Sequence, residues 1–191
     1  MLLHKSTKEA LTSYLQEKKF ISTDQQVLAT EKPGEGNMNY TIRVKLTNGS
    51  IILKQSNPYV KKYPSVPAPQ ERAIAEANFY KIISANPTLT SVMADFIGID
   101  EDNFMNVMED LGDAKDLSYL YKRQAMISYD EIKKLCEYLS ILHEEYSIEE
   151  GGTSLSNMAL RKLNHEHVFV YPFLEDNGFD LDVIQQGLQA C

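Results

Sequence analysis

The stretch Pro33–Lys54, PGEGNMNYTIRVKLTNGSIILK, decides how the rest of this chain is interpreted. It opens with a glycine-rich turn, continues with side chains that alternate, turns again at Asn48-Gly49 and ends on a lysine. Alternation with a period of two is typical of a half-buried strand, and Asn-Gly between two such runs is typical of a hairpin. We therefore expect strands over residues 38–47 and 50–55, joined by a tight turn.

Three segments flank this hairpin. A strand over residues 25–32 precedes the turn and completes a three-stranded antiparallel meander. Ser6-Thr7-Lys8-Glu9 has the pattern of a capping box, and apolar residues at helical spacing follow it, so a helix over residues 7–19 is expected to pack on the sheet. Four prolines in residues 56–69 argue against regular structure there. A loop of this length is either functional or a plain connector.

The second half of the sequence has fewer strand signals. A helix is expected over residues 70–85, ended by Asn86-Pro87, and two further strands over residues 92–99 and 104–108. Five antiparallel strands with one helix between the third and fourth make an α+β lobe. Only helical patterns follow Leu111, which divides the chain into residues 1–111 and 112–191. The helices expected in the second part span residues 116–122, 129–146, 156–164 and 181–190.

Length and composition set the class of protein. The chain has 191 residues, of which 43% are hydrophobic and 24% charged, as expected for a globular protein with one domain or two small lobes. The net charge of −8 argues against non-specific binding to nucleic acid or to an anionic membrane surface. A nucleotide remains compatible, because a few local donors hold its phosphates. Two distant cysteines, no signal peptide and no long apolar run indicate a cytoplasmic protein.

The order of four features predicts chemistry at phosphates. The small-residue turn Gly34–Asn37 lets backbone N–H groups approach phosphate oxygens closely. Lys54 ends the third strand, where its ammonium group reaches the α- and β-phosphates, and it needs a carboxylate to hold it extended. Glu76 in the next helix fits that role, with Glu71 as the competing candidate. Val107–Leu111 then offers an extended backbone to the edge of an adenine ring.

Two other polar clusters do not predict a metal site. His165 and His167 lie two residues apart, so on a helix they point in different directions, and no further zinc ligand is in view. Asp180 and Asp182 superficially resemble a metal-binding pair, but helix capping explains them better.

Five segments in a fixed order resemble the N-terminal lobe of the methylthioribose kinases, and the resemblance extends over about residues 30–112. This family belongs to the aminoglycoside-phosphotransferase and choline-kinase group, with a protein-kinase-like bilobal fold. A looser resemblance to the family's middle helices continues over Asn157–Pro172. The segments that carry it are Glu35–Tyr40, Ile52–Gln55, Pro58–Val60, Arg72–Glu76 and Val107–Leu111.

The resemblance implies a fold, a site and a reaction. Residues 1–111 would form a kinase-like N-lobe with a five-stranded antiparallel sheet, and residues 112–191 an incomplete helical C-lobe. The reaction would be ATP-dependent phosphorylation of the 1-hydroxyl of 5-methylthioribose, in methionine salvage. Glu76 would position Lys54, and Asn37 or Asn39 would join Lys54 at the phosphates. Glu109, Asp110 and Leu111 would line the adenine. The implied ATP-binding set is Gly36, Asn37, Asn39, Lys54, Glu76, Glu109, Asp110 and Leu111.

The sequence also departs from the family. The His-Gly-Asp catalytic loop and the Asp-x-Glu motif that holds magnesium do not occur in it, so no catalytic residue and no metal ligand is assigned. We expect a truncated enzyme, inactive alone, whose uncovered apolar surface drives self-association into a homo-oligomer. A non-catalytic nucleotide-binding or regulatory module and a purely structural or interaction protein are the alternatives. Choline, homoserine, fructosamine and aminoglycosides remain open as substrates.

Overall fold

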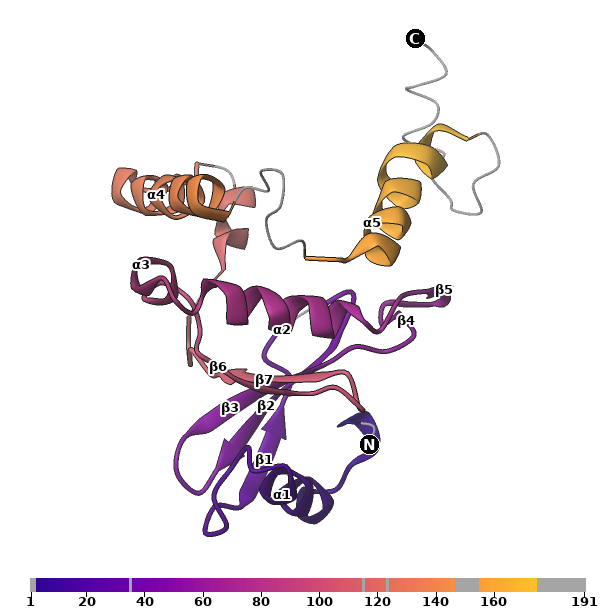
Figure 1. Cartoon of the computed structure of the whole chain (residues 1–191), viewed down its shortest axis with the longest axis vertical. Helices are drawn as coiled ribbons and strands as arrows, with labels where there is room; N and C mark the ends of the chain where they lie inside the picture. Colours follow the sequence, from indigo (N-terminus) through magenta and orange to yellow (C-terminus); the bar gives the residue numbers. More distant parts are fainter. Residues whose placement is uncertain (1–2, 35, 115, 123, 147–154, 175–191) are drawn as a thin grey trace.

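The fold was analysed in a computed structural model, which describes residues 3–34, 36–114, 116–122, 124–146 and 155–174. Figure 1 shows the arrangement of the elements. The strands are β1 (Val27–Glu31), β2 (Tyr40–Leu46), β3 (Ser50–Gln55), β4 (Tyr59–Val60), β5 (Tyr63–Pro67), β6 (Phe96–Asp100) and β7 (Met105–Glu109). The α-helices are α1 (Lys8–Glu17), α2 (Arg72–Ile83), α3 (Pro87–Thr90), α4 (Tyr129–Tyr146) and α5 (Met158–His165). Short helical turns span Leu3–Lys5 (η1), Leu117–Tyr121 (η2), Glu166–Val170 (η3, a π-helix) and Tyr171–Phe173 (η4).

The centre of the molecule is a five-stranded antiparallel sheet in the order β1-β2-β3-β7-β6. Helix α1 lies on one side of this sheet and α2 on the other, and α4 and α5 lie beyond α2 (Figure 1). The expected α+β architecture and its five antiparallel strands are therefore confirmed. Helix α2 falls between the third and fourth strands of the sheet in chain order, as expected.

The hydrophobic core lies between α1 and the sheet. Leu11 and Leu15 on α1 are almost fully buried against the apolar face of β2, β3 and β7. Antiparallel pairing places Val44 opposite Ile51, and Leu53 opposite Val107, so their side chains share this face. The helix begins one residue later than the capping-box pattern indicates, because Thr7 rather than Ser6 is the N-cap and accepts a hydrogen bond from Ala10 N. The core side chains of the sheet are Val27, Val44, Leu46, Ile51, Leu53, Met105 and Val107.

The opposite face of the sheet is polar where α2 crosses it. Thr41, Lys54 and Asn106 are directly paired across β2, β3 and β7, so they form one row on this face. Helix α2 contacts β6 and β7 and turns Ala73 and Ala77 inward. Small inward side chains let the helix approach the sheet closely, which brings its polar residues within reach of the row.

The structure corrects the expectation that residues 56–69 lack regular structure. They contain the two-stranded hairpin β4–β5, with Tyr59 opposite Pro67 and Val60 opposite Tyr63. Prolines are excluded from central strands because they have no backbone N–H to donate to a neighbouring strand, but each strand of a two-stranded hairpin has one open edge, where no donor is needed. Pro64 and Pro67 therefore fit in β5.

A second correction concerns residues 86–99. The expected strand over residues 92–99 begins only at Phe96, because residues 87–90 form the short helix α3 and turn hydrogen bonds continue after it, from Val92 N to the Leu89 carbonyl and from Met93 N to the Thr90 carbonyl. Asn86 caps this helix by accepting hydrogen bonds from the N–H groups of Thr88 and Leu89, and Pro87 occupies its first turn. The same Asn-Pro pair thus ends one helix and starts the next.

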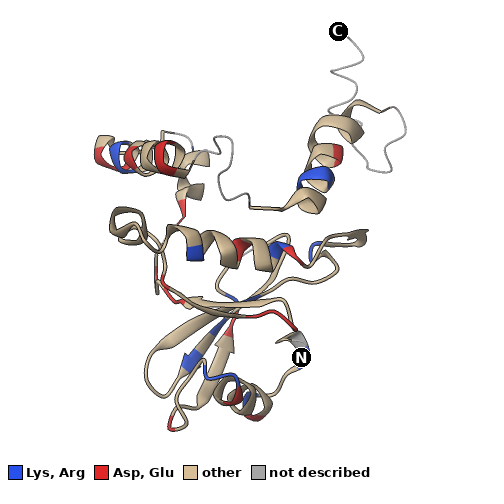
Figure 2. Cartoon of the chain, viewed as in Figure 1, with Lys and Arg blue, Asp and Glu red and all other residues tan. Residues whose placement is uncertain are grey.

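Every described element after β7 is helical, in agreement with the sequence pattern. Helix α4 has the expected bounds and carries acidic and basic side chains along its length (Figure 2). The segment expected at residues 116–122 is the 3-10 turn η2, and α5 covers most of the helix expected at 156–164. The helix expected at 181–190 lies outside the described residues. Within those residues, no helix is both long enough and apolar enough to cross a membrane.

Candidate phosphate-binding site

A pocket of about 610 Å³ opens between the glycine turn, β2, β3, α2 and α5. It holds five of the eight residues implied as ATP ligands, although they come from three separate segments of the chain. These five are Gly36, Asn37, Asn39, Lys54 and Glu76. A volume in this range is typical of pockets that bind small molecules. The remaining lining residues are Met38, Thr41, Arg72, Ala75, Phe79, Leu155, Asn157, Leu160 and Asn164.

Lys54 and Glu76, both in the pocket lining, form an ion pair. Lys54 Nζ lies 2.6 Å from Glu76 Oε1, and the two side chains remain 30% and 25% exposed. Asn106 holds the other carboxylate oxygen, because its Nδ2 donates to Glu76 Oε2 at 3.3 Å and to the carbonyl of Ala73 at 3.1 Å. Glu71, the competing candidate, is exposed at the N-terminus of α2 and makes no side-chain capping bond. The lysine therefore pairs with the carboxylate one turn inside the helix.

The glycine turn presents open backbone to the pocket. A Cβ atom added at Gly36 would meet only the carbonyl oxygen of Asn39, at 3.7 Å, which is an ordinary contact. Packing within the protein therefore does not require a glycine there. The carbonyl of Asn37 accepts a hydrogen bond from the N–H of Lys62, which ties the turn to the tip of the β4–β5 hairpin. Lys61 in the same tip lies over the ring of Tyr40, with its Nζ 5.0 Å from the ring centre.

Arg72 fixes the second asparagine of the turn. Its Nε donates to Asn39 Oδ1 at 2.8 Å, and Ser56 Oγ donates to the same oxygen at 3.2 Å. Its Nη1 donates to the carbonyls of Asn57 and Pro69 at 2.9 and 2.5 Å, and its Nη2 to the carbonyl of Met38 at 3.2 Å. Burial lowers the pKa of the Arg72 guanidinium, opposed by the charges of Glu71 and Glu76, yet an arginine remains charged at neutral pH.

The described part of the pocket lining is cationic in a protein that is acidic as a whole. Among the described lining residues, Lys54 and Arg72 supply two positive charges against the single carboxylate of Glu76. The hydrogen-bonding partners of Arg72 are all neutral oxygens, and no described carboxylate pairs with it. A pocket with an excess positive charge and amide side chains suits an anionic ligand, since such a ligand completes the charge balance.

The three residues implied for adenine do not line this pocket. The Asp110 side chain is buried just after the end of β7, where its carboxylate pairs with Arg43 Nε at 2.7 Å and accepts a hydrogen bond from Ser50 Oγ at 2.5 Å. Burial disfavours its ionised form, but the hydrogen bonds from Arg43, Ser50 and the Gly112 N–H outweigh this and lower its pKa. The N–H of Glu109 donates to the carbonyl of Asp95, and Leu111 is exposed.

The residues considered for metal binding do not form a metal centre in the described part of the chain. There, no group of three or more histidine, cysteine, aspartate or glutamate side chains lies close enough to hold a metal ion. His165 ends α5 and His167 lies in η3, where its Nδ1 is 2.9 Å from the carbonyl of Leu163. Both carboxylate oxygens of Glu76 are engaged by Lys54 and Asn106, so we assign no magnesium ligand in the pocket. Asp180 and Asp182 lie outside the described residues.

Sequence reasoning missed Arg72 and Asn106 as parts of this site. Arg72 lies four residues before Glu76, and this spacing places both on one face of a helix, a signal that was available. Asn106 is a single polar residue inside the apolar run Phe104–Met108, and it is fully buried. A buried amide in such a run needs polar partners, which here are Glu76 and the Ala73 carbonyl. The contribution of α5 has no comparable sequence signal.

Neither a scan against protein-family models nor a comparison with curated proteins gave a significant match for this chain.

Proposed function

We propose that this pocket binds the phosphates of ATP and that the protein is a small-molecule phosphotransferase of the methylthioribose-kinase type. The observation that carries the proposal is the 2.6 Å ion pair between Lys54 on β3 and Glu76 on α2, beside the open glycine turn. In kinase-like folds, a strand lysine held by a helix glutamate is the group that binds the α- and β-phosphates. The additional positive charge of Arg72 among the described lining residues supports the same proposal.

The proposed ligand contacts follow from this geometry. Lys54 donates to phosphate oxygens while Glu76 keeps its side chain extended, and Asn106 keeps Glu76 in place. The backbone of Gly36 and Asn37 and the amide of Asn39 approach the same phosphates. By resemblance, the adenine lies near Glu109–Leu111, where the backbone contributes the contacts, because the Asp110 carboxylate is committed to Arg43.

The proposed substrate is 5-methylthioribose, which would receive the γ-phosphate of ATP on its 1-hydroxyl group. This assignment is based on the resemblance of residues 30–112 to the methylthioribose kinases. Choline, homoserine, fructosamine and aminoglycosides are the alternative substrates. Magnesium, when bound with the nucleotide, neutralises the charge of the phosphates. The described pocket offers magnesium no free carboxylate, because both oxygens of Glu76 are engaged.

One observation favours a second function, a non-catalytic nucleotide-binding module. Glu76 is the sole carboxylate among the described residues that line the pocket, and both of its oxygens are engaged. The described lining therefore has groups to bind phosphates but no free base to deprotonate a hydroxyl group. Binding without turnover is the behaviour that this arrangement predicts.

Two measurements on the purified protein test the proposal. Mg-ATP at a hundred times its Kd should stabilise the folded state by about 2.7 kcal/mol, a rise in Tm of about 5–10 °C for a chain of this size. Incubation with ATP and each candidate substrate, followed by mass spectrometry, then separates the two functions. Phosphorylated product supports the transferase, and stabilisation without product supports the binding module. The absence of any stabilisation by ATP or its analogues would contradict both.

A further inference from the structure

Arg72 carries a buried charge to which no described carboxylate is hydrogen-bonded, although the charges of Glu71 and Glu76 favour its ionised form. The residue is 6% exposed, and its four described hydrogen bonds all go to neutral oxygens. Burying an unpaired charge is costly, and the cost is reduced only in part by neutral hydrogen bonds. An arginine in this state beside an open pocket needs a reason beyond packing.

The bonds of Arg72 connect three segments around the pocket. Through the carbonyls of Met38, Asn57 and Pro69, the guanidinium holds the glycine turn, the start of the 57–69 segment and its end together. Arg72 is also the first residue of α2, one turn before Glu76. The helix is thus attached to the turn at Arg72 and to β3 at Glu76, about 6 Å apart along its axis.

The chemistry of Arg72 determines the orientation of the Asn39 amide. A guanidinium group has donors only, so the atom of Asn39 that faces Arg72 Nε must be the carbonyl oxygen. The Ser56 hydroxyl donates to the same oxygen. The amide nitrogen of Asn39, a residue of the pocket lining, then remains as the group that meets a ligand. Asn37 has no such clamp on its side chain, which is exposed.

We propose that Arg72 is a positioning residue that fixes Asn39 as a pure donor, so that Asn39 rather than Asn37 is the side chain that binds a polyphosphate oxygen. This inference deepens the proposed function, because it specifies one contact of the ATP site. It also selects the ligand by charge: fixed N–H donors beside a guanidinium whose described hydrogen bonds all go to neutral oxygens favour a phosphate anion over a cation or an apolar ligand. Arg72 acts through Asn39 and through its charge, without direct contact to the reacting atoms.

Titration calorimetry with inorganic triphosphate tests this contact separately from nucleotide recognition. Arg72→Lys keeps the charge but loses the planar fork, and Asn39→Ala removes the donor. Each should weaken triphosphate binding about tenfold, the loss expected for one hydrogen bond to a charged group. The double variant should bind about as weakly as the weaker single variant, because both changes remove the same contact. Arg161→Lys, an exposed arginine on α5 outside the pocket lining, is the matched control and should bind like the wild type.

Asn39→Asp provides a readout that a merely structural role would not give. The new carboxylate would pair with Arg72, so thermal stability should be kept or raised, while triphosphate affinity should fall more than tenfold because the donor becomes an anion. This variant also covers the case in which Arg72→Lys fails to fold. The inference is overturned if Asn39→Asp binds triphosphate like the wild type, or if the two losses in the double variant multiply to about a hundredfold.

The outcome for ATP distinguishes this inference from the function on which it rests. If triphosphate binds with the predicted dependence on Arg72 and Asn39 while ATP does not bind, the anion contact stands and the nucleotide function fails. If ATP binds but is insensitive to both residues, the proposed function stands and the inference fails. If the wild type binds neither ligand, both are wrong.

Discussion

Glu76 is the residue on which the polar contacts of the pocket converge. One of its carboxylate oxygens pairs with Lys54, and the other accepts a hydrogen bond from Asn106. Glu76→Gln keeps the shape but removes the charge that holds the lysine extended, so we expect Mg-ATP affinity to fall about tenfold, which calorimetry measures. Glu71→Gln is the matched control, since Glu71 lies in the turn before α2 and makes no described capping bond. Equal affinity in the two variants would show that the ion pair has no part in binding.

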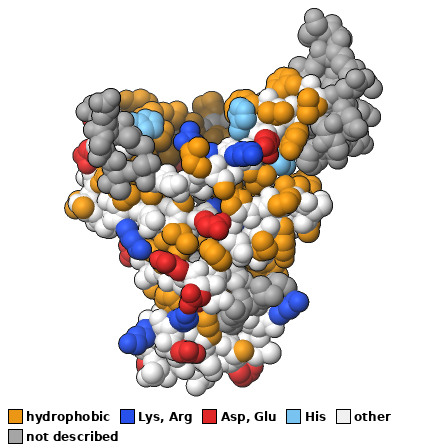
Figure 3. Space-filling model, turned by 45° about the vertical axis from the view of Figure 1, so that its right-hand side comes forward, with side chains coloured by type: hydrophobic (Ala, Val, Ile, Leu, Met, Phe, Trp, Pro, Cys, Tyr) orange, Lys and Arg blue, Asp and Glu red, His pale blue; other side chains and the backbone are white. Residues whose placement is uncertain are grey.

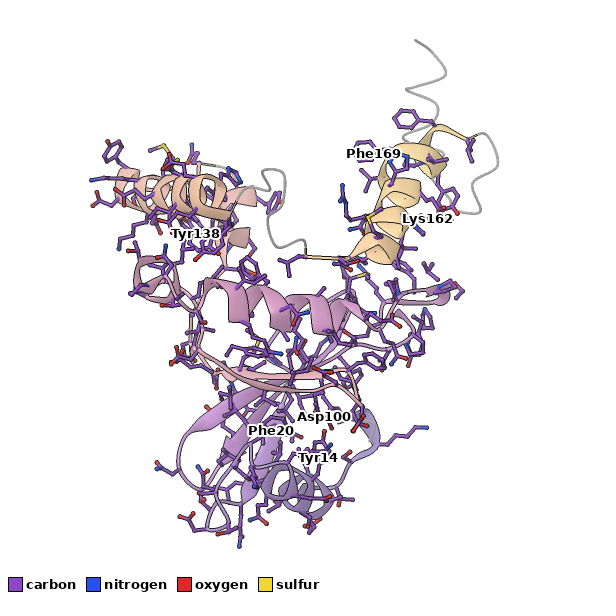
Figure 4. The ribbon with its side chains drawn as sticks, in the orientation of Figure 1. Tyr14, Phe20, Asp100, Tyr138, Lys162 and Phe169 are labelled. Atoms are coloured by element: carbon purple, nitrogen blue, oxygen red, sulfur yellow. The ribbon has the colours of Figure 1, made fainter. Side chains whose placement is uncertain are left out.

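Asp100 forms a second polar centre, on the side of the sheet where α1 packs. Figure 4 shows Tyr14 pointing from α1 toward Asp100 at the end of β6. The carboxylate accepts hydrogen bonds from the Tyr14 hydroxyl, from Asn103 Nδ2 at 2.6 Å and from Lys18 Nζ at 3.1 Å. Burial opposes its ionisation, but these hydrogen bonds outweigh burial and lower its pKa. The cluster therefore attaches α1 to the sheet.

The lowered pKa of Asp100 predicts a dependence of stability on pH. The folded state binds a proton at the Asp100 carboxylate less readily than the unfolded chain does. The contribution of Asp100 to stability is therefore complete well above the unfolded pKa of about 3.9, and it is lost as the pH falls through the lower pKa of the folded state. Urea unfolding at pH 7 should show Asp100→Asn less stable than the wild type by about 1–2 kcal/mol. The difference should shrink toward pH 3. Asp113→Asn, at an exposed carboxylate outside the cluster, should show neither effect.

At the level of residues, sequence reasoning found the charges but not their supports. Lys54 and Glu76 were predictable because a strand end and a helix position constrain where a side chain points. Arg72 and Asn106 act through contacts between segments more than 30 residues apart, such as Arg72 with Asn39 and Asn106 with Ala73. Local patterns carry no information on such pairs. For the same reason, the turning of the Asp110 carboxylate away from the pocket and toward Arg43 was not foreseen.

Among the elements, β6 packs closely against the segment after α1 at Gly98, which has the least room for a side chain of the described glycines. A Cβ atom added at Gly98 would meet the ring of Phe20 at 3.0 Å, and Phe20 packs against the core. Gly98→Ala should therefore destabilise the fold by about 1–3 kcal/mol, because the aromatic ring must shift. Thermal or urea unfolding measures this. Gly34→Ala, where nothing lies within 4 Å of the added atom, should change stability by less than about 0.5 kcal/mol. If both variants unfold alike, the packing of Phe20 on β6 is wrong.

The elements with strong local signals were predicted best. Strand β3 and helix α4 have the expected bounds, and the turn before β3 has Gly49 at a φ of 83°, the conformation that favours glycine there. The β4–β5 hairpin departs from the expectation because proline disfavours strands that are paired on both sides but is tolerated in the strands of an isolated hairpin. Helix α3 was missed because Asn86-Pro87 was interpreted as a stop signal alone.

Across the whole molecule, the helices after β7 expose apolar side chains that the N-terminal part does not cover. Ile132, Leu135 and Leu139 follow one another at helical spacing on α4 and are each more than 40% exposed. Figure 3 shows further hydrophobic side chains gathered around α5. Since exposed apolar stripes of this kind drive association, we expect the purified protein to form homo-oligomers, as the sequence also predicted.

Light scattering at several protein concentrations tests this expectation. The wild type should show a mass above 21.7 kDa that rises with concentration. Replacing Leu135 and Leu139 together with lysine should shift the protein toward the monomer, while Lys133→Ala on the same helix should leave the mass unchanged. A wild type that stays monomeric at high concentration would contradict the expectation.

The central claim, that the pocket between the glycine turn, β3 and α2 binds ATP through Lys54, has one direct test. Calorimetric titration of Mg-ATP into the wild type and into Lys54→Ala should give saturable binding to the wild type and affinity lower by about tenfold or more in the variant. Lys45→Ala, on β2 outside the pocket lining, should bind like the wild type. No binding by the wild type, or equal affinity in Lys54→Ala, would contradict the claim.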